Sequence, residues 1–81
     1  MTAKLTLYSK PGCHLCEELR RLLDELQPDL GFALEEIDIT LDPALFARYR
    51  HDIPVLLAGC DEIARGRITE RELLQLIRGT G

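Results

Sequence analysis

Cysteine is scarce in this chain, and long apolar runs are absent. Three cysteines in 81 residues are few and odd in number, which argues against a secreted disulfide framework and leaves a pair plus Cys60. No apolar run approaches the roughly 18 residues of a membrane span. Met1 to Lys4 lead directly into an expected strand, and not into a signal-peptide core. We therefore expect a cytoplasmic protein without membrane contact.

Excess positive charge and internal repeats are also lacking. Ten basic and fourteen acidic residues are interleaved, and the net charge is −4. Without a basic face, binding to nucleic acid is not expected. A length of 81 residues suffices for one hydrophobic core and is too short for two, so we expect a single domain spanning residues 1–81 and a monomer.

Two cysteines three positions apart follow the first expected strand, which covers residues 5–8. Pro11 and Gly12 form a turn, after which Cys13 and Cys16 enter a helix. The start of a helix offers unpaired backbone N–H groups and a partial positive charge. There a thiol pKa can fall from about 8.5 to roughly 3.5–7.5, so that the nucleophilic thiolate is populated at neutral pH. The pattern therefore indicates thiol redox chemistry.

The helix that begins at the cysteine pair has an apolar stripe at helical spacing. The stripe consists of Leu15, Leu19, Leu22, Leu23 and Leu26. Because Cys16 lies beside this stripe, we expect it to face inward while Cys13 faces outward. Gln27, Pro28 and Gly31 are expected to end the helix.

The remaining elements follow from turn and capping signals. We expect an edge strand at 32–39 and then a helix from Pro43 to about Arg50, with Asp42 as its N-cap and Leu41 stapled against Phe46. A buried strand at 55–58, a turn at 59–61 and a strand at 62–65 are expected to form a hairpin. The last helix is expected to have a Thr69–Glu72 capping box, an Ile68–Leu73 staple and a stop at Gly79. The expected order is βαβαββα.

With Lys10-Pro11-Gly12-Cys13-His14-Leu15-Cys16 at the first turn and Asp52-Ile53-Pro54-Val55 before a buried strand, the sequence resembles the glutaredoxin branch of the thioredoxin fold. It is most similar to small bacterial glutaredoxin-like proteins without an assigned substrate. The resemblance covers nearly the whole chain and implies an α/β fold with three helices on a four-stranded mixed sheet. It also implies that Pro54 is cis and lies against the cysteine pair, which leaves the backbone of Ile53 free to pair with a peptide-like substrate.

The same resemblance suggests where glutathione would bind. Lys10 stands at the position of the lysine that binds a glutathione carboxylate. Before the last helix, the family's two glycines and acidic or hydroxyl residue correspond here to Arg65-Gly66-Arg67-Ile68-Thr69, with one glycine and no aspartate. Arg65 and Arg67 are candidates for attracting an anion, and Gly66 and Thr69 are candidates for binding a carboxylate at this helix start. Glutathione is thus a candidate co-substrate, and no permanently bound cofactor is expected.

The expected reaction is thiol–disulfide exchange, in which Cys13 attacks a substrate disulfide and Cys16 resolves the mixed disulfide. The substrate would be a disulfide-containing protein, and the electron donor either glutathione or an enzyme of the thioredoxin-reductase type. His14 either stabilises the Cys13 thiolate or is a plain exposed residue, and Cys60 is expected to be a bystander. The alternative is a binding or metal-ligating module. Zinc needs four ligands, and Cys60, His14 and His51 form no second chelating pair, so no metal is expected.

Overall fold

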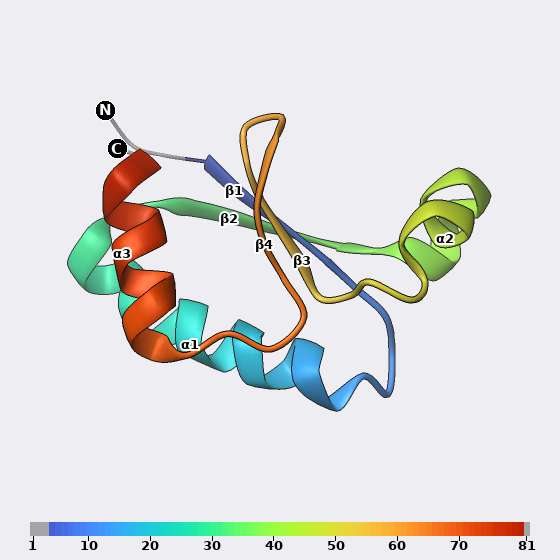
Figure 1. Cartoon of the computed structure of the whole chain (residues 1–81), viewed down its shortest axis with the longest axis horizontal. Helices are drawn as coiled ribbons and strands as arrows, with labels where there is room; N and C mark the ends of the chain where they lie inside the picture. The colour runs from blue at the N-terminus through green and yellow to red at the C-terminus, as the bar shows by residue number, and fades with distance from the viewer. Residues whose placement is uncertain (1–3, 81) are drawn as a thin grey trace.

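A computed structural model describes residues 4–80, in which a four-stranded mixed sheet has the strand order β2-β1-β3-β4 (Figure 1). The strands are β1 (Lys4–Ser9), β2 (Ala33–Asp38), β3 (Val55–Ala58) and β4 (Asp61–Arg65). Strand β1 is parallel to β2 and antiparallel to β3, and β3 forms an antiparallel hairpin with β4. As expected, the charged strand β2 lies at an edge of the sheet.

Within residues 4–80, three α-helices and one short 3-10 helix accompany the strands, and the last α-helix follows the last strand. They are α1 (His14–Leu30), η1 (Ile39–Leu41), α2 (Pro43–Tyr49) and α3 (Glu70–Thr80). Figure 1 shows α1 and α3 together on one side of the sheet and α2 at the far end. The order βαβαββα is confirmed, with η1 as an addition. Within residues 4–80, no helix is long and apolar enough to span a membrane.

The hydrophobic core lies between the sheet and the helix pair α1 and α3. Strand β1 contributes Leu5 and Leu7, helix α1 contributes Leu23, and strand β3 contributes Leu56, each fully buried. Burial of such a side chain contributes about 1.5–3 kcal/mol to folding. Strand β3 is central and buried along Val55–Leu57, as its continuous apolar run predicts. The core thereby fixes α1, and with it the cysteine pair, against β1.

Helix α1 ends at its cap Gly31, as predicted, but continues through Gln27 and Pro28, which were also expected to end it. Pro28 lies inside the helix, and the helix stops only at Leu30. Gly31 then adopts the left-handed conformation with φ 69°, and its N–H donates to the Gln27 carbonyl at 2.8 Å. The prediction that Pro28 ends the helix is therefore wrong, because the apolar stripe holds the last turn on the core and Gly31 supplies the cap.

The segment between β2 and α2 differs in part from the expectation. Asp42 is the N-cap of α2 and accepts from the N–H groups of Ala44 and Leu45, which confirms that boundary. However, Leu41 ends η1 and is 82% exposed, so the expected staple between Leu41 and Phe46 is wrong. The 3-10 turn, capped by Asp38, directs Leu41 into solvent.

The last helix begins as predicted and ends later. The Thr69 hydroxyl accepts from the Glu72 N–H at 3.2 Å, which confirms the first half of the predicted capping box. The Glu72 carboxylate accepts from the Thr69 hydroxyl, at 2.9 Å, in place of the Thr69 backbone N–H of a complete capping box. Ile68 packs against the core cluster that contains Leu73, as the staple requires. The predicted stop at Gly79 is wrong, since α3 runs to Thr80.

We expect the substitution Thr69→Ala to lower the free energy of unfolding by about 1 kcal/mol, because it leaves an N–H group of the first turn without its side-chain partner. Urea unfolding followed by far-UV circular dichroism measures this change. Thr69→Ser keeps the hydroxyl and is the matched control. Equal stability of the alanine and serine variants would contradict a stabilising cap.

Candidate redox site

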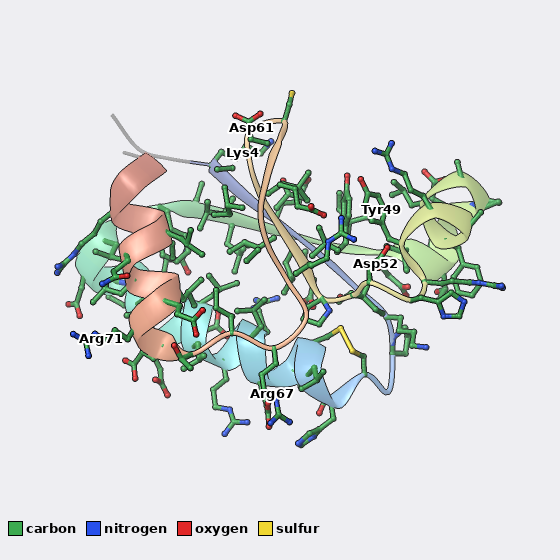
Figure 2. The ribbon with its side chains drawn as sticks, in the orientation of Figure 1. Lys4, Tyr49, Asp52, Asp61, Arg67 and Arg71 are labelled. Carbon is green, nitrogen blue, oxygen red and sulfur yellow. A yellow bond between two sulfur atoms is a disulfide. The ribbon has the colours of Figure 1, made fainter. Side chains whose placement is uncertain are left out.

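Cys13 and Cys16 lie where β1 ends and α1 begins, and they are joined in a disulfide (Figure 2). Gly12, with φ 76°, turns the chain at the tip of the connection, a conformation that favours glycine. Cys13 is the N-cap of α1. The two Cα atoms are 5.2 Å apart, within the usual range for a disulfide. The strand, the turn and the helix start thus bring both sulfur atoms together.

The two sulfur atoms differ in exposure. Cys16 is 2% exposed and lies on the buried face of α1, whereas Cys13 is half-buried at the surface. This confirms the expected inward and outward orientations. The backbone N–H of Cys16 donates to the Cys13 sulfur at 3.2 Å. A donor in this position favours negative charge on the outer sulfur, and the helix N-terminus adds its partial positive charge.

The Ile53–Pro54 peptide bond is cis, as the family resemblance implied. Tyr8 near the end of β1 pairs with Val55 at the start of β3, so the cis bond and the cysteine turn lie at the same end of the sheet. Pro54 is buried, and its carbonyl accepts from the Gly66 N–H at 2.8 Å. The bond to Gly66 also ties the loop before α3 to this end.

The backbone of Ile53 is not entirely free. Its N–H donates to the Tyr49 carbonyl at 3.2 Å, and the same carbonyl accepts a shorter bond of 2.8 Å from the Asp52 N–H. The expectation of a free backbone at Ile53 is therefore wrong for its amide. The cause is the end of α2, where the chain turns back and the last carbonyl groups take donors from the following residues.

Lys10 is exposed at the start of the turn and lines an open hollow of about 360 Å³. The hollow also contains three carboxylates, from Glu17, Glu36 and Asp38. The surroundings of Lys10 are thus mixed in charge. Its role in binding a carboxylate stays a prediction.

Arg65 is held by two carboxylates. Its guanidinium donates to both oxygens of Glu62, at 2.6 and 2.8 Å, and lies 3.2 Å from Asp52. The hydrogen bond to Glu62, followed by the nearby charges, raises the pKa of Arg65. This group lines a hollow of about 220 Å³ that also includes Tyr49 and Cys60. A ligand carboxylate at Arg65 would have to compete with Glu62 and Asp52.

The other predicted anion-binding residues lie at the start of α3. Gly66 has φ 70° and donates to Pro54, and both functions of the Thr69 hydroxyl are used within the capping box. Arg67 is exposed and lines a small hollow of about 40 Å³ with residues of α1, among them Leu15 and Glu18. Among Arg65, Gly66, Arg67 and Thr69, both Gly66 and Arg67 thus line a hollow together with the helix that carries the cysteines.

His14 lies along the surface of α1. Its side chain is 79% exposed, and its Nε2 atom is 3.1 Å from a Glu18 carboxylate oxygen, one turn further along the helix. Cys60, the third cysteine, is exposed in the β3–β4 turn. Within the described range 4–80, no group of three or more histidine, cysteine or acidic residues is placed to hold a metal ion.

Sequence reasoning missed a polar connection beneath the redox turn. The Ser9 hydroxyl donates to Glu36 at 2.8 Å, and Glu36 also pairs with Arg20 of α1. One signal was present in the sequence, since Ser9 continues the alternation of Leu5 and Leu7 and so stands on the buried face of β1. Glu36 as its partner requires the register of β2.

Comparisons with known proteins agree with this geometry. A family model described as Glutaredoxin-like domain (DUF836) matches residues 4–78. Protein Ne2328 from Nitrosomonas europaea is 32% identical with a TM-score of 0.76, over 93% of this chain and 91% of that one. Protein XcR50 from X. campestris is 25% identical with a TM-score of 0.80, over 93% and 96%. Thioredoxin 1 from Thermosipho africanus, at 18% identity and a TM-score of 0.69 over 94% and 91%, shares the fold. The thioredoxin fold is thereby confirmed.

Proposed function

Since this chain belongs to the glutaredoxin-like domain family, we propose that it is a dithiol oxidoreductase that reduces disulfides of proteins or of glutathione adducts. Cys13 is the nucleophile and Cys16 the resolving thiol. The family and the Cys13–Cys16 pair carry thiol redox chemistry in general.

One observation carries the assignment of roles. Cys13 is the accessible sulfur at the N-cap, with the Cys16 N–H directed at it, while Cys16 is 2% exposed. An external disulfide can reach the outer sulfur and is kept from the inner one. A thiolate at Cys13 would be stabilised by the same N–H and by the helix N-terminus.

The reaction balances as two exchanges. The Cys13 thiolate attacks one sulfur of the substrate disulfide, the substrate S–S bond breaks, and the departing thiolate takes up a proton. Cys16 then loses its proton and attacks the Cys13 sulfur, which releases the second substrate thiol and forms the intramolecular disulfide. Two electrons pass from the dithiol to the substrate. The disulfide form described above is the product of this half-reaction, and an external thiol donor must reduce it again.

The residues around the pair support a peptide-like substrate. The Ile53–Pro54 bond lies at the same end of the sheet as the redox turn, and the proposed substrate strand would pair with the backbone there. Because the Ile53 N–H bond of 3.2 Å shares its acceptor, a substrate carbonyl could replace it. Lys10 is the proposed contact for a substrate carboxylate. Glutathione or a reductase of the thioredoxin type is proposed as donor, with the chain acting as a cytoplasmic monomer.

The test is the equilibrium of the Cys13–Cys16 pair in a glutathione redox buffer, combined with mass analysis of glutathione adducts. We expect a two-electron midpoint and a transient adduct on Cys13. Failure to form the intramolecular disulfide, or loss of the thiols to a bound metal, would overturn the proposal and favour a binding module. The position of the midpoint gives the direction of electron flow.

A further inference from the structure

Ser9 is a hydroxyl residue in a position where the sheet buries leucine. Along β1, Leu5 and Leu7 are fully buried, and Ser9 on the same face is 6% exposed. A buried hydroxyl without a hydrogen-bond partner destabilises the folded state. Here the Ser9 Oγ–H donates to the Glu36 side chain at 2.8 Å. The buried Ser9 hydroxyl thus has a specific hydrogen-bond partner.

Glu36 connects this hydroxyl to the helix that carries the cysteines. It lies on β2 opposite Leu7, on the face covered by α1. Its Oε2 atom accepts from Ser9, and its Oε1 atom accepts from the guanidinium of Arg20. Arg20 in turn donates from Nε to Asp24 at 3.1 Å. A continuous chain of bonds therefore joins the end of β1, the edge strand β2 and the first half of α1.

This series of hydrogen bonds lies next to the disulfide. Ser9 is the last residue before the redox turn, and Arg20 lies four residues, or one helical turn, after Cys16. These hydrogen bonds therefore connect the end of β1, just before the cysteine turn, with α1, just after it. Within the loop, the Cys13 N–H reaches the Lys10 carbonyl at only 3.4 Å, which is a weak bond. When the disulfide is reduced, noncovalent contacts alone hold the two thiols in place.

We propose that Ser9, Glu36 and Arg20 form a positioning clamp that keeps Cys16 within reach of Cys13 in the dithiol form and so favours closure of the disulfide. This inference rests on the proposed redox function. Holding two reacting groups in the right geometry raises their effective concentration. A clamped α1 presents Cys16 to the Cys13 sulfur, whereas a loosened one samples positions that cannot close the bond.

The equilibrium that reports on the clamp is balanced in electrons and protons. The protein dithiol and one glutathione disulfide give the protein disulfide and two glutathione thiols. The two protein thiols lose two protons and two electrons, and glutathione disulfide accepts both. The equilibrium constant therefore compares the stabilities of the dithiol and disulfide forms of the protein.

The experiment measures this constant for the wild type and for variants of the clamp. For Arg20→Ala and for Ser9→Ala we expect a constant about tenfold smaller, which corresponds to a potential about 30 mV less negative. Arg21→Ala removes the same charge from an exposed neighbouring position on α1 and is the matched control, expected to match the wild type. Arg20→Lys, which keeps a cation for Glu36, is expected to recover most of the constant.

The outcomes separate this inference from its premise. A residue with a merely structural role would destabilise the dithiol and disulfide forms equally and leave the constant unchanged. Constants for Arg20→Ala and Ser9→Ala equal to that of Arg21→Ala would therefore overturn the clamp while leaving the redox function intact. A wild type with no dithiol–disulfide equilibrium would overturn both. If Arg20→Ala does not fold, Ser9→Ala, which removes one oxygen atom, decides alone.

Discussion

Replacing Cys13 by serine is expected to abolish disulfide reductase activity, by about a thousandfold or more, as loss of a nucleophile does in other enzymes. A serine hydroxyl is not ionised at neutral pH, and it cannot form the mixed disulfide through which the exchange proceeds. Turnover of a small disulfide substrate with an excess of glutathione measures the loss. Cys60→Ser is the matched control, because Cys60 is exposed in the β3–β4 turn, and we expect it to retain full activity.

The partner variant Cys16→Ser separates the roles of the two sulfurs. With Cys13 intact and the resolving thiol absent, the first exchange occurs and the second does not. Mass analysis should therefore find a stable adduct between Cys13 and the substrate or glutathione. Turnover retained in Cys13→Ser, or an adduct on Cys60 in place of Cys13, would contradict the assigned roles.

Truncation of the core leucine Leu23 to alanine is expected to lower the free energy of unfolding by about 2–5 kcal/mol. Leu23 is fully buried in the cluster that joins α1 to the sheet, so the substitution removes apolar contacts and leaves a cavity. Domains of this kind have about 5–15 kcal/mol in total, so one such loss is a large fraction. Chemical denaturation of the oxidised protein measures the change.

Leu41→Ala is the matched control for this prediction, since it is the same substitution at a side chain that is 82% exposed. We expect its effect to stay within about 0.5 kcal/mol. A similar loss at both positions would contradict the packing of α1 against β1. It would instead indicate that Leu41 is covered in solution.

Much of the fold was predictable because its signals are local. Hydrophobic spacing predicted α1, the run at β3 predicted a central strand, and the side chains of Asp42 and Thr69 marked two helix starts. Each of these signals depends on residues only a few positions apart. The errors are also local. Pro28 was expected to end α1, yet the helix continues past it because the apolar stripe packs on the core. Gly79 was expected to end α3, yet the helix extends one residue further, to Thr80, since helix ends vary by a residue or two.

The redox pair was equally a local prediction. The spacing of Cys13 and Cys16 at a strand-to-helix turn determined that one sulfur caps the helix and the other enters the core. The cis bond before Pro54 was implied by family resemblance, because nothing in the local sequence distinguishes it from the common trans form.

By itself, the sequence determined the redox-type cysteine pair and the element order, since both follow from neighbouring residues. Only the tertiary structure decided the partners that come from distant segments. It placed Asp52 beside the guanidinium of Arg65 and joined Ser9 to Glu36 across 27 positions. These contacts depend on strand register and on how helices sit on the sheet. No pattern of adjacent residues encodes that geometry, because many side chains of the same type compete for each charged group.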